Sequence, residues 1–436
     1  MKDQADIIII GAGAAGLMTA RELARQGKKV TVLEARNRTG GRICTLTDDG
    51  FKQGVELGAE FVHGHLPVTL DLLKQAKIPH PDATGDMWRY ADGRFSKAGE
   101  FLIHYDVIIK KLNALTKDIT LDEFLAKHLS AKKYTETCNT LRNFAAGYDT
   151  AEPSRFSAFA MRSELQSEEE DQYRVKGGYS AMITYLESEI IKHGGTIHLS
   201  SVAKELHWQQ GTVKVVTVNG REFKAAKAVI ALPLGVLQAG KNESGAITFN
   251  PPIPVREQAI QQMGMGAVIK LLLQFDKVFW DTHAIKKGAT ADIKKMSYLF
   301  SNEAIPTWWI QKPHTIPLLT GWIGGPAAAK LKDTSEEEIL NLGLTSLSHI
   351  YDMSLKQLRE KLAAYKIMNW TIEPFTLGSY SYATIATAEA RKILTEPEQD
   401  TLYFTGEALY NGPEMGTVEA ALSSGKDVAE RIARPS

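Results

Sequence analysis

The apolar residues near the start of the chain predict a strand, a helix and a second strand. Ile7–Ile10 is a run of four isoleucines, which is typical of a parallel strand covered by helices on both faces. A glycine-rich turn follows, and Gly27 ends the helical pattern before the apolar run Val30–Leu33. The apolar residues of the helix recur at helical spacing, at Leu17, Ala20, Leu23 and Ala24. This order predicts an α/β protein with a parallel sheet.

The turn between the first strand and the helix has the spacing of a dinucleotide-binding fingerprint. Gly11 permits a tight turn, Gly13 lets a pyrophosphate approach the backbone, and Gly16 lets the helix pack closely on the strand. The amides at the helix start, at Ala14 and Ala15, then face the phosphates and are favoured by the helix dipole.

Glu34 ends the second strand and narrows the choice of cofactor. It lies where a carboxylate accepts hydrogen bonds from ribose hydroxyls, so a 2′-phosphate, and with it NADP, is disfavoured. Strand, helix, second strand and terminal acid agree, so we interpret the unit as a nucleotide site rather than an ordinary βαβ turn. By itself the unit suits NAD as well as FAD.

The rest of the chain continues to alternate between strands and helices. Residues 67–175 are mostly helical in pattern, and we predict a helical layer inserted into the nucleotide-binding domain. A strand near 228–231 is expected to return to the first sheet. At the end of the chain, Leu402–Phe404 precedes Gly406-Glu407 and a helix that starts near Gly416, which repeats the anion-binding geometry of the opening unit.

Composition excludes several functional classes. The 436 residues include 51 basic and 51 acidic side chains, so neither nucleic acid nor an anionic membrane is expected as a partner. Cys44 and Cys138 have no metal-ligand spacing and suit a reducing compartment. The first strand begins too early to leave room for a signal peptide, and no apolar run is long enough to span a membrane. We therefore expect a soluble, cytoplasmic protein without a metal site.

Three further segments suit chemistry, and each has a plainer alternative. Arg38–Arg42, with its central glycine pair, suits a phosphate ligand or is a basic surface turn. Lys270 lies in an apolar strand; such a lysine usually extends its amine to solvent, but a buried one would be a functional candidate. The acidic run Glu168–Asp171 suits charge steering of a cation or is a solvated loop.

Several separated motifs resemble the flavin-dependent amine oxidase family, which includes monoamine oxidases, polyamine oxidases, L-amino-acid oxidases and histone lysine demethylases. They span essentially the whole chain in the family's order. The motifs are GAGAAG at 11–16 with Glu34, RTGGR at 38–42, GAEFVHG at 58–64, LPLGV at 232–236, Lys270, Trp370 with Tyr380, and FTGE at 404–407 followed by GTVEAA at 416–421.

The resemblance implies FAD and two domains. Residues 1–66, 176–252 and 396–436 would form a discontinuous Rossmann-like FAD-binding domain, and residues 67–175 and 253–395 a substrate-binding domain with a mixed sheet and helices. The implied cofactor contacts are Gly11, Gly13, Ala14, Ala15, Gly16, Glu34, Ala35, Arg36, Gly40, Gly41, Arg42, Gly58, Ala59, Glu60, Val202, Trp370, Gly406, Glu407, Gly416 and Thr417.

The resemblance also implies the catalytic residues Lys270, Tyr380 and Trp370. Lys270 would sit near flavin N5, usually through a water, and Tyr380 would form one wall of an aromatic cage. Thr417 takes the position of the second wall. Glu60 and His63 would line the substrate entrance.

Departures from the family pattern refine the substrate class. Ser379 stands where monoamine oxidases carry the flavin-linking cysteine, so FAD is expected to be non-covalent. Glu60, after Gly58-Ala59, stands where L-amino-acid oxidases place an arginine, which argues against an amino-acid substrate. His63 matches animal-type polyamine oxidases, whereas Glu419 replaces a histidine that those enzymes often have. The motifs are closest to the polyamine oxidases.

We therefore predict an FAD-dependent oxidase that transfers a hydride from an amine C–N bond to flavin N5 and gives imine or aldehyde and hydrogen peroxide. The expected partners are a small amine, with a polyamine favoured, and oxygen; a homodimer is left open. The alternatives are a small monoamine oxidase, a flavin-dependent desaturase or porphyrinogen-type oxidase, and a non-catalytic flavin-bound interaction protein.

Overall fold

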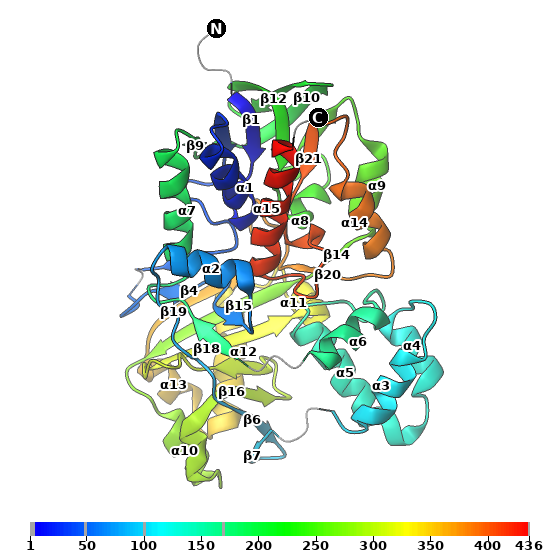
Figure 1. Cartoon of the computed structure of the whole chain (residues 1–436). Coiled ribbons are helices and arrows are strands. Elements are labelled where there is room, and N and C mark those ends of the chain that lie inside the picture. Colours follow the sequence, from blue (N-terminus) through cyan, green and yellow to red (C-terminus); the bar gives the residue numbers. More distant parts are fainter. Residues whose placement is uncertain (1–4, 48–49, 99–101, 168–170, 435–436) are drawn as a thin grey trace.

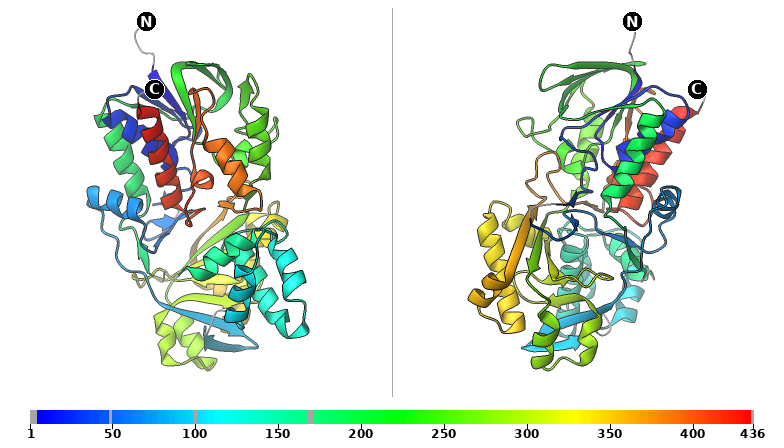
Figure 2. Two further views of the ribbon diagram at one scale, coloured as in Figure 1. Left: turned by 45° about the vertical axis from the view of Figure 1, so that its right-hand side comes forward. Right: turned by 90° about the vertical axis from the view of Figure 1, so that its left-hand side faces the viewer.

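The computed structural model describes residues 5–47, 50–98, 102–167 and 171–434. Two sheets lie toward opposite ends of the molecule, and a group of helices stands beside the second sheet (Figures 1 and 2). Both ends of the chain lie beside the first sheet. No helix among the described residues is both long and apolar enough to cross a membrane.

The first sheet contains eight strands within the described residues, in the order β13-β10-β11-β12-β1-β2-β9, with β21 paired to β12. The pairs that join β1, β2, β9, β12 and β21 are parallel, as the sequence predicts, while β11 pairs antiparallel with β10 and β12. The bounds are β1 Ala5–Ile10, β2 Val30–Leu33, β9 Thr196–His198, β10 Ala203–Gln209, β11 Thr212–Thr217, β12 Glu222–Ile230, β13 Thr248–Asn250 and β21 Leu402–Phe404.

Helices cover both faces of this sheet, which explains the four isoleucines. Ile7 and Ile9 pack in a cluster with α1, α7 and α15, whereas Ile8 and Ile10 pack in the cluster of α9 and α14. Successive strand residues point to opposite faces, so a strand buried on both must be apolar throughout. These helices are α1 Ala14–Arg25, α7 Ser180–Lys192, α8 Leu234–Leu237, α9 Pro254–Gln262, α14 Thr387–Thr395 and α15 Val418–Ala433.

The second sheet is mixed and, over the described ranges, has seven strands in the order β19-β15-β18-β17-β16-β6-β7. Only the β16–β6 pair is parallel among the pairs of this sheet. The bounds are β6 Asp86–Ala91, β7 Arg94–Lys97, β15 Val268–Phe275, β16 Met296–Ser301, β17 Thr307–Trp309, β18 Leu318–Gly324 and β19 Leu362–Asn369.

Strand alternation also determines which way Lys270 points. Ile269 and Leu271 pack on a cluster with helices α10 (Trp280–Lys286), α12 (Glu336–Tyr351) and α13 (Leu355–Lys361). Val268 and Leu272 pack in a different cluster, with residues 51–57 and Trp370. Because side chains alternate, Lys270 shares the second face, which is turned toward the first half of the chain.

The remaining elements connect and flank the sheets. Residues 67–175 are largely helical, as predicted, but β6 and β7 leave this segment and join the second sheet. Helices α3–α6 bury a cluster of their own. The bounds are α2 Pro67–Gln75, α3 Tyr105–Asn113, α4 Leu121–His128, α5 Thr135–Gly147, α6 Ala158–Gln166, α11 Gly325–Lys330, β3 Thr45–Leu46, β4 Val55–Glu56, β5 Phe61–His63, β8 Gln172–Arg174, β14 Gly264–Met265, β20 Ser381–Tyr382, and the 3₁₀ turns Lys132–Tyr134, Ala291–Lys295 and Glu407–Leu409.

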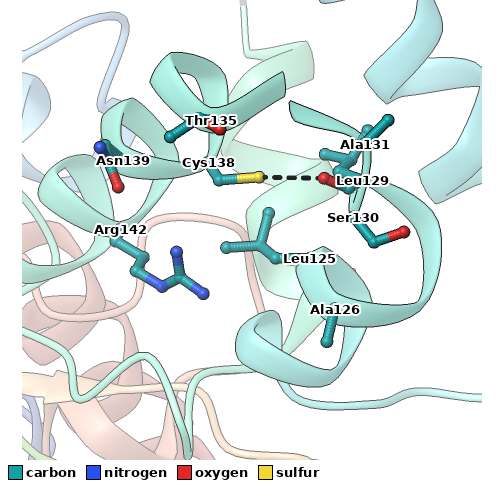
Figure 3. Close-up of a pocket in the computed structure, with 9 residues that line it drawn as sticks. All are labelled: Leu125, Ala126, Leu129, Ser130, Ala131, Thr135, Cys138, Asn139 and Arg142. Atoms are coloured by element: carbon teal, nitrogen blue, oxygen red, sulfur yellow. Dashed lines mark hydrogen bonds between the residues drawn. The ribbon is translucent and has the colours of Figure 1, made fainter. Parts of the chain in front are cut away.

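A pocket of about 220 Å³ lies between α4 and α5 (Figure 3). Leu125 and Leu129 line it together with Cys138, whose thiol donates to the Leu129 carbonyl at 3.6 Å. All its lining residues belong to α4, α5 and their connection, so it is separate from the sequence-predicted site.

Candidate functional site

The opening glycines have the geometry that a phosphate cradle requires. Gly11 has φ +107°, and Gly13 precedes the first residue of α1. A Cβ on Gly13 would meet nothing within 4 Å, so the space in front of the helix start is open. A Cβ on Gly16 would lie 2.0 Å from the Gly11 carbonyl oxygen, which only glycine avoids. The amides of Ala14 and Ala15 follow on the same helix start.

Glu34 is buried at the end of β2 and fixes the neighbouring loops. Its two oxygens accept from the amides of Ala12 at 2.8 Å and Arg36 at 2.9 Å. The Ser201 amide donates to the Glu34 carbonyl at 2.7 Å, which brings Val202 and Ala35 to the same end of the sheet.

The predicted 38–42 loop joins this cradle to the end of the chain. The Gly40 amide donates to the Ala12 carbonyl at 2.8 Å, and Gly41 lies against Gly13. The Arg42 guanidinium donates to Glu407 at 2.8 Å and to the Ser379 carbonyl at 2.9 Å. Three distant segments therefore meet around Arg42.

Gly58 and Ala59 lie against the backbone of Arg42. The Ala59 amide donates to the Arg42 carbonyl at 3.3 Å, and a Cβ on Gly58 would come within 1.7 Å of the same oxygen. It would also lie 3.3 Å from the ring of Trp370, whose indole donates to the Leu57 carbonyl at 2.8 Å. The structure thus brings Trp370 to the glycine loop.

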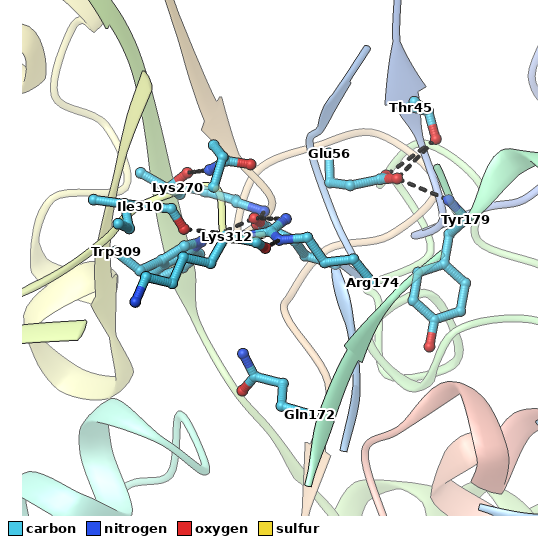
Figure 4. Close-up of polar contacts among 12 residues, drawn as sticks. Thr45, Glu56, Gln172, Arg174, Tyr179, Lys270, Trp309, Ile310 and Lys312 are labelled. Atoms are coloured by element: carbon cyan, nitrogen blue, oxygen red, sulfur yellow. Dashed lines mark hydrogen bonds and ion pairs between the residues drawn. The ribbon is translucent and has the colours of Figure 1, made fainter. Parts of the chain in front are cut away.

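Glu60 forms the centre of a buried ion-pair network, and Figure 4 labels its partners Arg174, Lys270 and Trp309. One of its oxygens accepts from Arg174 at 2.6 Å and from the Trp309 indole at 2.9 Å, and the other accepts from Lys270 at 2.6 Å. We call these four residues the Glu60 cluster. Burial alone would raise the pKa of Glu60, but the Lys270 and Arg174 charges and the hydrogen bonds from Lys270 and Trp309 lower it to about 2.

Glu56 is a second buried carboxyl nearby, but its partners are neutral. It accepts from the Thr45 hydroxyl at 3.0 Å and from the Tyr179 amide at 2.8 Å (Figure 4). Burial raises its pKa to about 7, against the lowering effect of the Tyr179 amide and the Lys270 charge.

Aromatic rings run from Tyr380 to His63 across the second sheet. Tyr380 stacks on Trp322 with 6.5 Å between centroids, and Trp322 is 5.9 Å from Trp309. Phe61 lies 6.2 Å from Trp309 and 5.7 Å from His63. The His63 side chain is reached by solvent, yet protein atoms crowd it closely enough to lower the imidazole pKa to about 4 by desolvation. We call this row the aromatic wall.

Two acids lie beside the Tyr380 end of the aromatic wall. Trp322 donates to the Gly147 carbonyl at 2.8 Å and the Tyr380 hydroxyl donates to the Tyr148 carbonyl, so Asp149 follows directly. Burial and Glu164 raise the pKa of Asp149, and burial raises that of Glu164 to about 7.

We call Asp149 and Glu164 the Asp149 pair. One Asp149 oxygen is buried without a hydrogen-bond partner, and no basic side chain of the described residues lowers the pKa of either acid. Burial, then Asp149, raises the pKa of Tyr380, so this carboxyl lies close to the ring.

The remaining predicted residues have these positions. Gly416 lies against the Tyr380 ring, and Thr417 caps α15 by accepting from the Ala420 amide at 3.1 Å. Glu419 binds the Val68 and Thr69 amides at the start of α2. In the acidic run, Glu168–Glu170 lie outside the described residues; the Asp171 carbonyl accepts from the Gly64 amide at 2.7 Å.

Sequence reasoning missed several residues of this region. Arg174, Trp309, Trp322, Asp149 and Glu164 were given no role. The tryptophans stand out by their number in residues 308–370, but the acids follow no motif. Within the described ranges, no group of three or more His, Cys, Asp or Glu residues could hold a metal ion.

Comparison with known proteins decides the family. The model of the flavin containing amine oxidoreductase family matches residues 14–433. This chain belongs to that family. Relatives of this chain include lysine-specific histone demethylase 1 homolog 3 of Arabidopsis thaliana, 26% identical over 99% of this chain and 30% of that protein. Polyamine oxidase 2 of the same plant is 27% identical over 97% of this chain and 87% of that protein.

The chain spans only about half, or less, of the length of the demethylases that it matches. A solved structure of wild-type putrescine oxidase bound to putrescine is 20% identical, with a TM-score of 0.81, and covers 99% of this chain and 100% of that one. That likeness confirms the fold. The family match confirms the predicted family.

The residues present fit the flavin that the family implies. Open space lies in front of Gly13 and Gly406, where a Cβ would meet nothing within 4 Å. Gly406 has φ +152°, which favours glycine. The hydroxyl of Ser379 is buried without a partner among the described residues, at a point where Arg42 and Glu407 converge. These features suit a long polar ligand that extends from the helix start of α1 toward Lys270.

Proposed function

We propose that this amine oxidoreductase oxidises a C–N bond of a diamine or polyamine with non-covalent FAD. The Asp149 pair carries the choice of substrate: it places two acids without a counter-ion beside Tyr380, and their raised pKa values indicate that their charged forms lack a partner within the chain. A buried charge is costly unless it is paired, so a cationic ligand would stabilise this region. The C-terminal end of α5 adds partial negative charge at the same place.

This arrangement would give the two nitrogens of a diamine substrate different environments. The reacting nitrogen must be neutral, and an aromatic-walled site disfavours an ammonium by desolvation. Tyr380 and Trp322 would orient that nitrogen, with Gly416 and Thr417 opposite Tyr380. A second nitrogen of the same substrate would stay charged beside the Asp149 pair, where aromatic faces also attract cations.

The bound flavin would supply the two-electron acceptor for the hydride that leaves the substrate carbon. The residues of this chain bind, orient and desolvate the amine. The products would be an imine, which water converts to an aldehyde and an amine, and hydrogen peroxide from oxygen.

Ser379 and Trp370 enter the proposal on the cofactor side. Ser379 cannot form the thioether that a cysteine forms, so acid precipitation should release all the flavin into the supernatant. Flavin that stays with the precipitate would contradict non-covalent binding. Trp370 and the Gly58 loop would support the flavin ring, with Glu34 and Val202 near the adenosine end.

A peroxide-coupled screen tests the substrate class. It compares a diamine, a triamine, a monoamine of equal carbon length, an L-amino acid and an N-methyl-lysine peptide. We expect the diamine or triamine to give the highest kcat/KM. Preference for the methylated peptide would favour the activity named in the demethylase relatives, and preference for the monoamine would remove the role of the Asp149 pair. Oxidation of none would favour a desaturase or a non-catalytic protein.

Asp149→Asn should raise the KM for the diamine by about 10- to 100-fold, because a hydrogen bond to a charged group is lost. The KM for the monoamine should change little. Glu136→Gln is the matched control, since Glu136 is exposed at the other end of α5. Equal losses for diamine and monoamine would contradict a charge-recognition role.

A further inference from the structure

Lys270 is held more tightly than a lysine at the edge of a site. Its side chain is 1% exposed, and its amine donates to Glu60 at 2.6 Å and to the Gly58 carbonyl at 3.2 Å. A lysine ammonium has three protons to donate. Among the described residues these two contacts use two of them, so one proton is left for a ligand or a water.

Glu60 is oriented by donors that do not contact Lys270 through hydrogen bonds. Arg174 and Trp309 both bind one oxygen of Glu60, which leaves the other oxygen for Lys270 (Figure 4). Arg174 is itself fixed by the carbonyls of Lys312 at 2.6 Å and Ile310 at 3.2 Å. The carboxylate therefore has one available orientation.

We propose that Glu60 is a positioning residue: Arg174 and Trp309 orient it, and it holds the Lys270 ammonium charged and in place at the reacting centre. This inference rests on the proposed function, because it assigns Lys270 to the reaction of that site. It gives Glu60 an indirect role in place of the substrate contact expected from the sequence.

The charge of the cluster explains what this arrangement does. Two cations and one carboxylate leave a net positive charge within the buried Glu60 cluster. Fixed positive charge in a water-poor site stabilises negative charge that develops during reaction. Reoxidation takes one reduced flavin carrying two electrons and one proton, one dioxygen and one solvent proton, and gives oxidised flavin and one hydrogen peroxide. Lys270 contributes charge to this step and no electrons.

Without Glu60 the ammonium would lie buried near Arg174 and would lose its only ion pair among the described residues. Glu56, whose pKa the Lys270 charge lowers, would be the remaining acid that faces it. Burial and a neighbouring like charge both disfavour a charged amine. Glu60→Gln keeps the shape of the side chain and removes its charge. In that variant the effect of the Lys270 charge should fade as pH rises.

The test measures flavin reoxidation by oxygen in stopped flow after photochemical reduction, so it needs no amine substrate. In Glu60→Gln the rate constant for flavin reoxidation should fall about 10- to 100-fold between neutral and alkaline pH. In the native protein the same rate constant should change much less over this range. Glu60→Asp should restore the flat profile. A Glu60→Gln profile parallel to the native one would overturn the proposal, because a merely structural role predicts no change in pH dependence.

A double variant separates positioning from general damage. Lys270→Met should itself slow reoxidation, and adding Glu60→Gln to it should have no further effect, because residues that act as one unit are not additive. Additive losses would contradict the proposal. If Glu60→Gln does not fold, Trp309→Phe removes only the indole donor and should give the same pH-dependent change at smaller size. A parallel Trp309→Phe profile would then count against the proposal.

The midpoint of thermal unfolding of each flavin-free variant, measured across the same pH range, provides a readout that needs no activity. Glu60→Gln should lose more stability at neutral than at alkaline pH, because a buried cation without its partner is most costly where it is fully charged. An equal loss at every pH would indicate a purely structural pair. Failure of an amine to bleach the native flavin would refute the proposed function, but it would leave this test intact.

Discussion

The Glu60 cluster and the Asp149 pair both contain acids shielded from solvent, but only Glu60 is fully buried and paired with cations of the chain, whereas Asp149 and Glu164 are half-buried. Glu60 receives two cations and an indole donor, and its pKa falls to about 2. Asp149 receives a second acid instead, and the pKa of its carboxyl rises through burial and through Glu164. Glu60 therefore has cationic neighbours, whereas the neighbour of Asp149 is a second acid.

The difference distinguishes a carboxylate that the folded chain neutralises itself from acids that a bound cation would have to neutralise. A buried carboxylate that the chain itself neutralises can be a permanent part of the structure. Two acids without a cation are unfavourable in the isolated protein and favourable once a cation binds. Within this chain, that contrast would separate the proposed positioning residue Glu60 from residues that would recognise substrate.

Breaking the Glu60 cluster should have the largest effect. Arg174→Met removes three hydrogen bonds of a charged group, to Glu60 and to the Lys312 and Ile310 carbonyls, so the free energy of unfolding should fall by about 3–5 kcal/mol. Urea unfolding followed by circular dichroism would measure it.

Arg142→Met is the matched control for this loss. Arg142 pairs with Asp122 at 2.8 Å, but both side chains are about 40% exposed (42% and 38%). Removing this surface pair should cost about 0–1 kcal/mol. Equal losses for the two variants would remove the distinction between a buried cluster and an ordinary ion pair.

Diamine binding at the Asp149 pair should depend on pH near 7, where the Glu60 carboxylate stays charged. The pKa of Glu164 is raised to about 7, so the Asp149 pair gains a proton and loses negative charge as pH falls through this value. The KM for a diamine should therefore rise by about fivefold to tenfold on going one unit below it, since one proton opposes binding. Steady-state kinetics at several pH values would measure the change.

Two controls sharpen that measurement. A monoamine of equal length corrects for protonation of the reacting nitrogen, which every amine shares. Glu164→Gln should flatten the extra dependence seen with the diamine. If the diamine KM of Glu164→Gln still depends more strongly on pH than the monoamine KM, the titrating group must be another residue.

Much of the first sheet could be predicted from the sequence because its signals are local. The isoleucine run, the glycine turn and Glu34 all lie within 28 residues, and the predicted strand Val30–Leu33 matches β2. The addition of β6 and β7 to the second sheet could not be predicted. It depends on pairing between β6 and β16, which are about 200 residues apart in the sequence and carry no shared pattern.

The same limit applies to the site. Lys270 could be recognised because a charge inside an apolar strand is unusual wherever it occurs. Its orienting partners could not, because Arg174 meets Glu60 across 114 positions of sequence. The acidic run Glu168–Asp171 drew attention by local charge density, whereas Asp149 and Glu164 approach each other only through the packing of α5 and α6.

Glu56 stands between the two extremes because its hydrogen-bond partners are neutral. Its folded pKa of about 7 exceeds the ordinary value of 4.5, so the folded protein keeps a proton that the unfolded chain releases. Stability should therefore fall by about 3 kcal/mol as pH rises from about 4.5 to 7, and it should stay level above that. Glu56→Gln should flatten this slope, as measured by the midpoint of thermal unfolding, whereas Glu136→Gln on the surface should leave it unchanged. A slope that survives in Glu56→Gln would place the titrating group elsewhere, and the Asp149 pair would be the next to replace.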